Sequence, residues 1–297
     1  MTTLFIGLGK MGGPMARQYA AAFNTTLYDV GPAATQLADE LGVRALETLD
    51  TVPEEIDTVI LMVPNSRIVE SIMLTGDRLL EKLPEGALVI DMSSSVPTST
   101  QMLAARAAEH GIGYVDAPVS GGTAKAVTGQ LAIIVGGEPT AVERAMPHLE
   151  PMAGSILVVG PSGSGHAAKA LNNLLSATNI AAAAEILTIS TKFGIDPAVM
   201  VNVLNASTGR SQATEVKFPK HILTGTWDSG FGMDLMIKDL GIARDLAAET
   251  GTESPLTATT FEIANTARET VGGELPDHTE LARYYELRND ITFTPSQ

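Results

Sequence analysis

The sequence contains no cysteine, one tryptophan, and only 19 Lys and Arg against 34 Asp and Glu among its 297 residues. The absence of cysteine excludes disulfides, thiolate zinc sites, iron–sulfur clusters and a cysteine nucleophile. The formal net charge of −15 disfavours nucleic acid and membranes as partners, because phosphate backbones and acidic headgroups repel an acidic protein. Hydrophobic residues make up 44% of the chain, which is typical of a globular protein.

A metal site and a targeting segment are also not expected. The histidines are scattered and none forms an HExxH pair: His110, His148, His166, His221 and His278. The N-terminal segment MTTLFIGLG lacks the charged and apolar regions of a signal peptide. No uninterrupted apolar run reaches the roughly 18 residues that span a bilayer. We therefore expect a cytoplasmic protein with no membrane partner.

The first half of the chain alternates short apolar runs with segments of helical pattern, such as 11–22 and 99–110. Near-continuous apolar runs are typical of strands buried on both faces of a parallel sheet, and their alternation with helices indicates βαβ units. The predicted strands are Thr3–Ile6, Thr26–Tyr28, Thr58–Val63, Leu88–Met92, Tyr114–Ala117, Leu131–Val135 and Ile156–Val159.

The pattern changes after a glycine-rich break at 161–165. Residues 166–193 contain neither Gly nor Pro, which predicts one long helix that ends at Gly194. Further helices are predicted at 197–206, 233–250, 255–270 and 277–289. We expect an α/β dinucleotide-binding domain with a doubly wound, mostly parallel sheet at 1–161, and an all-helical domain for substrate binding and oligomerisation at 162–297.

Gly7, Gly9 and Gly12 form a GxGxxG pattern that also contains Lys10 and Met11. The pattern follows a predicted strand and opens a predicted helix, which is the context that dinucleotide binding requires. The glycines permit a tight turn, close approach of the pyrophosphate and close packing of helix on strand, and the helix N-terminus offers free N–H groups.

Asp29 ends the second predicted strand, 17 residues after Gly12. A carboxylate about 20 residues after such a turn binds the ribose hydroxyls and repels a 2′-phosphate, so we expect NAD rather than NADP. The alternative is that Asp29 only begins a turn before Gly31 and Pro32.

Polar or tight-turn residues follow three further strands. Pro64 and Asn65 follow the third strand, Ser94 the fourth, and the segment 120–122 the fifth. Because ligands of open α/β sheets bind beyond the carboxyl ends of the strands, these residues are candidates for binding. Ser and Asn are also common helix N-caps, so each is compatible with an ordinary loop.

Lys169 and Asn173 lie four residues apart near the start of the long helix and share one face of it, which His166 borders. A lysine is usually a solvated surface charge. Here it lies between a glycine-rich turn and an Ala- and Leu-rich face, which favours a functional role.

With these motifs, the sequence resembles the β-hydroxyacid dehydrogenases, the family that includes 3-hydroxyisobutyrate dehydrogenase and tartronate semialdehyde reductase. The resemblance covers essentially the whole chain. Four segments carry it, in the family's order: Gly7–Ala16, Asp116–Gly129, Gly163–Asn173 and Lys238–Ala243.

The resemblance implies a role for each matching residue. Lys169 falls on the catalytic lysine and Asn173 on the asparagine that orients the substrate. The substrate carboxylate is implied at Ser120, Gly121 and Gly122. The cofactor contacts implied are Asn65, Ser94, Lys238, which reaches the nicotinamide region, and Phe231, which closes over it.

Three residues depart from the family pattern. Ser94 stands where threonine is commoner, and His166 where glutamine is frequent. Lys125 stands where a glycine is usual, within the substrate segment. We hypothesise that Lys125 holds a second anionic group, so that the substrate is a diacid, a sulfonate or a phosphonate. The alternative is a surface lysine.

The expected activity is hydride transfer, without a metal, between NAD and a small β-hydroxy acid or its semialdehyde. Lys169 is expected to exchange the proton as general acid and base, with a pKa lowered by burial and by the positive nicotinamide. A homodimer or homotetramer is implied by the resemblance.

Three other interpretations are compatible with the sequence. One is a decarboxylating relative of 6-phosphogluconate dehydrogenase, although such chains are much longer. Another is a reductase of a related aldehyde, sulfonate or imine, although imine reductases usually replace the lysine found at Lys169. A third is a non-enzymatic NAD sensor, which would have no need to retain Lys169, Asn173 and Lys238 together.

Overall fold

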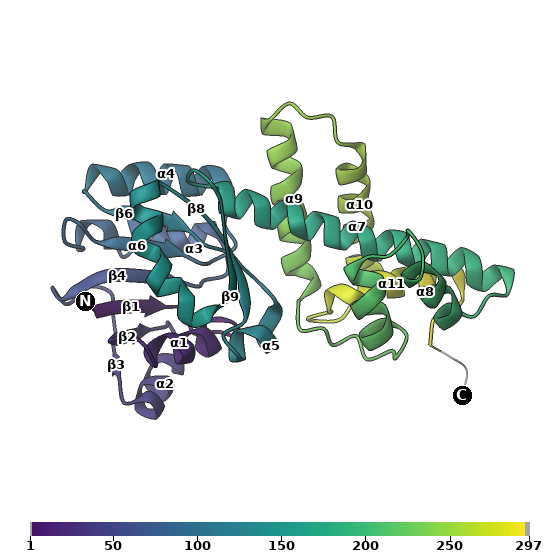
Figure 1. Ribbon diagram of the computed structural model, residues 1–297, viewed down its shortest axis with the longest axis horizontal. Helices are drawn as coiled ribbons and strands as arrows, with labels where there is room; N and C mark the ends of the chain where they lie inside the picture. Colours follow the sequence, from purple (N-terminus) through teal and green to yellow (C-terminus); the bar gives the residue numbers. More distant parts are fainter. Residues whose placement is uncertain (1, 295–297) are drawn as a thin grey trace. The chain divides into compact units, whose positions relative to one another are not determined.

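The structure, a computed structural model, describes residues 2–294. It divides into two compact units with the boundary after Lys169. The N-terminal unit contains a nine-stranded sheet, and the C-terminal unit is built of helices (Figure 1).

The sheet has the strand order β3-β2-β1-β4-β5-β6-β8-β7, and β9 pairs with β8. All pairs from β3 to β6 are parallel, as is β8 with β9, whereas β8 runs antiparallel to β6 and β7. The strands are β1 (Thr2–Ile6), β2 (Thr25–Tyr28), β3 (Arg44–Ala45), β4 (Ile56–Leu61), β5 (Leu88–Asp91), β6 (Gly113–Asp116), β7 (Val119–Ser120), β8 (Leu131–Gly137) and β9 (Ala153–Gly160).

Helices cover both faces of this sheet, because alternate strand residues point to opposite sides. Phe5 and Ile60 pack with α1, α2 and α6, whereas Leu4 and Leu61 pack with α3, α4 and the turns that follow α3. The helices are α1 (Gly12–Ala20), α2 (Ala33–Leu41), α3 (Ser66–Glu70), α4 (Pro97–Glu109), α5 (Gly122–Val127) and α6 (Pro139–Leu149). Shorter helical turns are η1 (Ser71–Thr75), η2 (Leu79–Glu81) and η3 (Glu150–Met152).

The strand order reverses between β1 and β4, because β2 lies on one side of β1 and β4 on the other. In doubly wound sheets ligands bind beyond the carboxyl ends of the strands at this switch point. The loop after β1 carries the glycine-rich turn and the loop after β4 carries Asn65. The topology therefore brings two separately predicted segments to one edge of the sheet.

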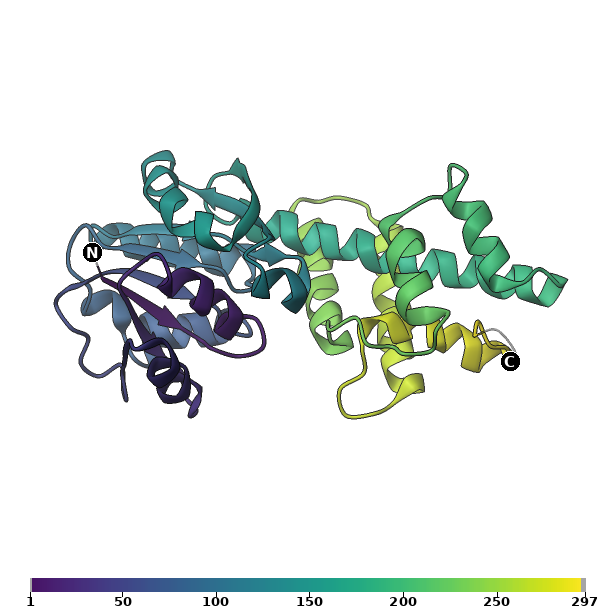
Figure 2. The ribbon, with the colours of Figure 1, turned by 60° about the horizontal axis from the view of Figure 1, so that its bottom comes forward.

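Within residues 170–294 the regular elements are helices, and one isolated β-bridge joins Gly232 and Asp277. The long helix α7 (Ser164–Phe193) begins in the N-terminal unit and continues into this one. It is followed by α8 (Pro197–Asn205), η4 (Ala213–Ile222), α9 (Met233–Glu249), α10 (Pro255–Val271), η5 (His278–Glu280) and α11 (Leu281–Asn289). Figure 2 shows the same elements from a second direction. Buried residues of α7, such as Ile180 and Leu187, pack in one core with Phe218, Leu240 and Phe293.

Helix α7 is long and apolar enough to cross a membrane by length and composition alone. In the structure 44% of its most apolar window is buried inside the protein. Core helices of soluble proteins meet the same criterion, so the finding is weak evidence for a span.

The predicted fold class is confirmed: a doubly wound, mostly parallel sheet is followed by a helical part that a long helix leads. The differences are local. The two-residue strands β3 and β7 were not predicted, because so short a segment shows no hydrophobic period. The π-helical turns of η4 were not predicted either, and their spacing, as in the bond from Leu223 N to Phe218 O (2.8 Å), departs from the α-helical one.

Candidate active site

In the glycine-rich turn between β1 and α1, neighbouring backbone atoms leave no room for a side chain at two of the glycines. Gly7 has φ +93°, and a Cβ there would lie 2.3 Å from the Met62 carbonyl oxygen. A Cβ at Gly12 would lie 1.9 Å from the Gly7 carbonyl oxygen. A Cβ at Gly9, in contrast, would have no atom within 4 Å, so its backbone faces open space. The turn thus combines tight packing with an accessible backbone, as pyrophosphate binding requires.

The N-terminus of α1 has no competing negative charge of its own. Its N-cap residue, Met11, makes no side-chain capping bond, and no acidic residue lies in the first turn. Lys10, in the same turn, is exposed. Free N–H groups and the helix dipole favour an anion at such a position. These residues therefore fit the phosphates of a dinucleotide.

Asp29 connects the end of β2 to the glycine-rich turn. Its Oδ2 accepts a hydrogen bond from Leu8 N (2.7 Å), and its Oδ1 accepts one from Gly31 N (3.0 Å). The turn before Gly31 is therefore real, but it does not exclude binding, because a carboxylate has lone pairs for further donors. Asp29 also fixes the backbone of the turn, which composition and spacing did not show.

The residues predicted after β4 and β5 have structural partners. Asn65 is the N-cap of α3, and its Oδ1 accepts from Ile68 N (3.2 Å). Pro64 precedes it in the same loop, and Ser94 lies half-buried after β5. Next to Ser94, the Ser93 Oγ accepts from Val63 N (3.1 Å), which ties the two loops together. The cofactor role of Asn65 and Ser94 remains a prediction.

The predicted substrate segment is a short strand followed by a short helix. Ser120 ends β7, which pairs with β8 opposite Ala132, and α5 begins at Gly122. Gly121 has φ +135° and Gly122 has φ +68°, conformations that L side chains rarely adopt. Lys125, one turn into α5, is exposed. The residues predicted to bind substrate therefore form one compact turn.

The start of α7 is anchored on the sheet by a buried carboxylate from β6. Asp116 Oδ1 accepts from Gly163 N (2.8 Å), and Asp116 Oδ2 accepts from His166 N (3.0 Å). Gly165 allows this approach, since a Cβ there would lie 2.6 Å from the Ile134 carbonyl oxygen. An anion at a helix N-terminus is favourable. The anchor fixes the helix one turn before Lys169, which is half-buried.

A second buried aspartate completes the anchor. The side chains of Asp91 and His166 have no exposed area, and Asp91 Oδ2 lies 3.9 Å from His166 Nε2. Asp91 also accepts from Ser93 N (3.0 Å) and from the Ser95 hydroxyl (3.1 Å). The Tyr114 hydroxyl donates to Asp91 (3.3 Å), and burial, followed by the charge of Asp91, raises the pKa of this phenol well above its ordinary value. His166 thus has a structural role.

In the C-terminal unit, a buried carboxylate joins two of the predicted site residues. Asp239 is 2% exposed and lies on α9 next to Lys238. Its Oδ2 accepts from Asn173 Nδ2 (2.6 Å), and its Oδ1 lies 3.2 Å from Lys238 Nζ. Asn173 is therefore held by its amide nitrogen, which leaves its carbonyl oxygen oriented toward Asn172 Nδ2 at 3.4 Å. Asp239 was not among the predicted residues, although it lies within the segment 238–243.

Phe231 precedes α9 and is held by a buried histidine network. The Phe231 carbonyl oxygen accepts from His278 N (2.8 Å), and the two rings meet edge to face with centroids 5.2 Å apart. Lys217 Nζ lies 2.8 Å from His278 Nε2 and donates to Ser176 Oγ (2.8 Å). Burial and the charge of Lys217 lower the pKa of His278 despite the opposing effect of Asp277.

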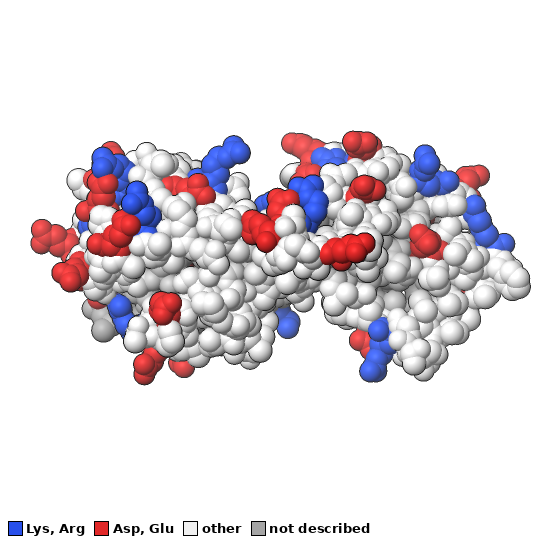
Figure 3. All heavy atoms as spheres, turned by 90° about the horizontal axis from the view of Figure 1, so that it is seen from above, with Lys and Arg blue, Asp and Glu red and all other residues white. Residues whose placement is uncertain are grey.

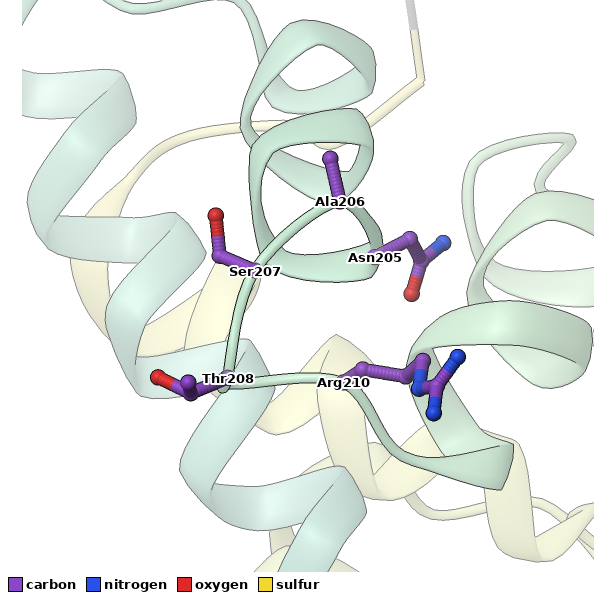
Figure 4. Close-up of a pocket in the computed structure, with 5 residues that line it drawn as sticks. All are labelled: Asn205, Ala206, Ser207, Thr208 and Arg210. Carbon is purple, nitrogen blue, oxygen red and sulfur yellow. The ribbon is translucent and has the colours of Figure 1, made fainter.

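A separate hollow of about 480 Å³ lies at the loop after α8 (Figure 4). It contains none of the residues that the sequence singles out. Asn205 donates to the Thr214 carbonyl oxygen (3.0 Å), and its own Oδ1 is buried without a hydrogen-bond partner in the described chain. Figure 4 shows Ser207 and Thr208 pointing away from Asn205 and Arg210, so the polar groups do not converge on one point.

Known families match both parts of the chain. Residues 2–160 match the NAD binding domain of 6-phosphogluconate dehydrogenase, and residues 163–285 match a family described as NAD-binding of NADP-dependent 3-hydroxyisobutyrate dehydrogenase. Together with the doubly wound sheet and the glycine-rich turn, these matches define the class: a dehydrogenase with a dinucleotide-binding domain.

Individual relatives extend over nearly the whole chain. The 2-(hydroxymethyl)glutarate dehydrogenase of Eubacterium barkeri is 37% identical over 99% of this chain and 97% of its own. The 2-hydroxy-3-oxopropionate reductase of Escherichia coli is 36% identical over 95% of this chain and 96% of its own. A structure of Mycobacterium tuberculosis 3-hydroxyisobutyrate dehydrogenase with L-serine superposes on this chain with a TM-score of 0.87 and 32% sequence identity. The match covers 95% of this chain and 98% of that one. This chain belongs to the β-hydroxyacid dehydrogenase family, and the resemblance inferred from its motifs is confirmed.

Proposed function

We propose that this NAD-binding dehydrogenase transfers a hydride between a small β-hydroxy acid and its semialdehyde, with Lys169 as the proton-transferring group and without a metal. The observation that carries the proposal is the anchored start of α7, where Asp116 and His166 fix the helix one turn before Lys169. The names of the relatives support the substrate class, since they denote enzymes of small hydroxy acids.

The bound nicotinamide would accept or supply the hydride. Lys169 would take the hydroxyl proton during oxidation and return it to the carbonyl oxygen during reduction. Asn173, held through its Nδ2 by Asp239, would orient the reacting hydroxyl with its free carbonyl lone pair. Ser120 and the N–H groups of Gly121 and Gly122 would hold the substrate carboxylate as fixed dipoles.

We propose that residues 1–161 form the dinucleotide-binding domain and also supply the carboxylate-binding turn at 120–122, and that residues 162–297 supply Lys169, Asn173 and the oligomerisation surface. We propose a homodimer or homotetramer in which a second copy covers the exposed apolar side chains of α7, such as Ile186, Ile189 and Phe193, which are 42%, 60% and 84% exposed. Light scattering coupled to gel filtration tests this, and a strictly monomeric protein would contradict it.

NAD is proposed as the preferred cofactor because the Asp29 carboxylate would repel a 2′-phosphate. The test is the ratio of kcat/KM with NAD⁺ to that with NADP⁺. We expect a ratio above about tenfold in the native enzyme and a clear fall in Asp29→Asn, since the repulsive charge is removed. A native preference for NADP⁺ would overturn this part of the proposal.

The activity itself is tested by following absorbance of the reduced nicotinamide with a panel of hydroxy acids. The panel includes 3-hydroxyisobutyrate, glycerate, serine, 3-hydroxypropionate, threonate and 2-(hydroxymethyl)glutarate. Turnover of at least one β-hydroxy acid supports the proposal. Cofactor binding with no turnover across the panel would contradict it and would favour the sensor or a reductase of other substrates.

A further inference from the structure

Lys125 is a solitary charge in the predicted substrate segment. Between Ala117 and Gly137 it is the only charged residue of 21, in a chain whose overall charged fraction is 18%. Asp116 and Glu138, which flank this stretch, are the nearest charged residues along the chain. An anion bound at this turn would therefore meet one local cation and no acidic side chain from the same stretch.

The side chain of Lys125 lies directly over the turn that is proposed to hold the substrate carboxylate. A Cβ placed on Gly121 would lie 2.6 Å from Lys125 Cδ, 2.9 Å from its Cβ and 3.1 Å from its Cγ. The lysine stem thus covers the space where a side chain at Gly121 would stand. Because Nζ is two bonds beyond Cδ, the ammonium can reach the space beside this turn.

The helix that carries Lys125 is fixed to the cofactor-binding part of the same unit. Gln18 on α1 donates to the Val127 carbonyl oxygen at the end of α5 (2.7 Å). A Cβ at Gly129 would lie 2.8 Å from the Pro151 carbonyl oxygen, so the chain after α5 is closely packed as well. The turn at 120–122 and the lysine above it are therefore positioned by α1, the helix that follows the glycine-rich turn.

The ammonium of Lys125 has no hydrogen bond or ion pair to any residue of the described chain, 2–294. Among the other exposed lysines of residues 2–294, Lys192 has such a partner, since its Nζ donates to Asn289 Oδ1 (3.0 Å), whereas Lys10 and Lys220 resemble Lys125 in having none. Figure 3 shows that acidic and basic side chains are intermixed on the face drawn there, without a broad field of one sign. Because the formal net charge of the chain is −15, a cation at this site would act locally and not through a general positive surface.

We propose that Lys125 selects dianionic substrates: one carboxylate binds at residues 120–122 and a second anionic group, a carboxylate in the first instance, pairs with the Lys125 ammonium. This inference rests on the proposed function, and it adds the substrate class. This charge-assisted contact strengthens the binding of the dianion. Because the second carboxylate is remote from the reacting hydroxyl, the contact is expected to change substrate affinity and not the hydride-transfer step.

The test compares 2-(hydroxymethyl)glutarate with the analogue in which the side-chain carboxylate, remote from the hydroxymethyl group, is replaced by an amide. The two compounds have the same size and differ by one charge. The native enzyme is expected to prefer the dianion by about tenfold in kcat/KM, mainly through KM, and Lys125→Met is expected to lose that preference. Lys125→Arg should retain most of it. Lys220→Met, an exposed lysine of η4, is the matched control for net charge and should leave the ratio unchanged.

A binding measurement separates failure of this inference from failure of the proposed function. Calorimetry measures the binding of glutarate and of glutaramate to the protein loaded with its nicotinamide cofactor. Neither compound can be oxidised, because both lack the hydroxyl. About tenfold tighter binding of glutarate, lost in Lys125→Met, supports the proposal even if the turnover substrate differs. Equal affinities in the native protein, or an unchanged ratio in Lys125→Met, would overturn it, whether or not hydroxy acids are turned over.

Discussion

Two of the buried histidines, His166 in the N-terminal unit and His278 in the C-terminal unit, lie in opposite electrostatic surroundings. His166 is 1% exposed and lies between two carboxylates, with Asp91 at 3.9 Å and Asp116 at 4.0 Å. His278 is 5% exposed and lies between the ammonium of Lys217 at 2.8 Å and the carboxylate of Asp277 at 3.4 Å. The same side chain thus bridges like charges in one place and opposite charges in the other.

Their partners also assign the ring protons differently. His166 Nε2 lies 3.1 Å from the Ser93 carbonyl oxygen, which can only accept, so Nε2 carries a proton. His278 Nε2 faces the Lys217 ammonium, which can only donate, so that nitrogen is unprotonated and the proton is on Nδ1, 3.1 Å from the Phe231 carbonyl oxygen. The hydrogen bond at one ring nitrogen decides which nitrogen is protonated.

The difference has a consequence for each unit. His166 and Asp116 supply a fixed anchor for the start of α7, upstream of Lys169. The contact between Lys217 and His278 requires a neutral ring, because a protonated Nε2 would face an ammonium. The first arrangement is a rigid support, and the second is sensitive to acid.

The largest effect is expected from Asp116→Ala. The substitution leaves the buried N–H groups of Gly163 and His166 without acceptors, which costs about 3 kcal/mol or more in the free energy of unfolding. Turnover should fall as well, because the helix that carries Lys169 loses its anchor. Chemical denaturation followed by circular dichroism measures the first effect, and kcat the second.

Asp245→Ala is the control for Asp116→Ala. Asp245 forms an ion pair with Arg244 on the surface, and its side chain is 59% exposed. Exposed pairs contribute little, so stability and turnover should both be retained. Native-like stability of Asp116→Ala would show that the carboxylate is dispensable as an anchor.

A smaller effect is expected from His278→Gln. The substitution removes the ring, and with it the edge-to-face contact with Phe231 and the Nδ1 contacts with Ser229 Oγ and the Phe231 carbonyl oxygen, and should lower the free energy of unfolding by about 2 kcal/mol. The single tryptophan, Trp227, lies in the C-terminal unit, so its fluorescence reports unfolding there. His110→Gln, at an exposed histidine of the N-terminal unit, should leave the unfolding transition followed by Trp227 fluorescence unchanged. Equal shifts of this transition in the two variants would refute the role assigned to His278.

The pH dependence should show the smallest of the three effects. Because burial, with Lys217, lowers the pKa of His278 in the folded protein, the unfolded chain binds a proton first as the pH falls. The stabilisation is therefore complete above the ordinary histidine pKa of about 6.5 and decreases below it, by at most about 1.4 kcal/mol per pH unit.

His148 in the N-terminal unit also has a pKa lowered by burial, so the total pH dependence has more than one source. The difference between the native protein and His278→Gln isolates the contribution of His278. Between pH 7 and pH 5 the Trp227 transition of the native protein should lose more stability than that of His278→Gln. Parallel pH profiles would contradict the lowered pKa.

The sequence predicts the fold well where hydrophobic pattern is continuous. Strands such as β1 and β4 are runs of apolar residues because both faces of the sheet are buried, and α7 is read from a segment that lacks Gly and Pro. Strand β7 and the helix α5 that follows it could not be read in this way. They are short, and pairing with β8 and packing on α1 stabilise them more than their own pattern does.

The site is predicted only in part, for a similar reason. Motif spacing places Gly7, Gly9 and Gly12 on a tight turn, and helical period places Lys169 and Asn173 on one face of α7. The contacts that hold them are remote in sequence: Asp116 reaches His166 across 50 residues, and Asp239 reaches Asn173 across 66. Local patterns carry no signal for such pairs, and the roles assigned to Lys169, Asn173 and Lys238 remain predictions.

The most direct test of the central claim is the turnover of Lys169→Met with the hydroxy acid that the native enzyme oxidises, measured beside the affinity of both proteins for reduced cofactor. We expect kcat to fall by about 10²- to 10⁴-fold, because the proton-transferring group is lost, while cofactor affinity stays within about threefold of the native value. Native-like turnover by Lys169→Met would contradict the account, since the proton would then leave by another route.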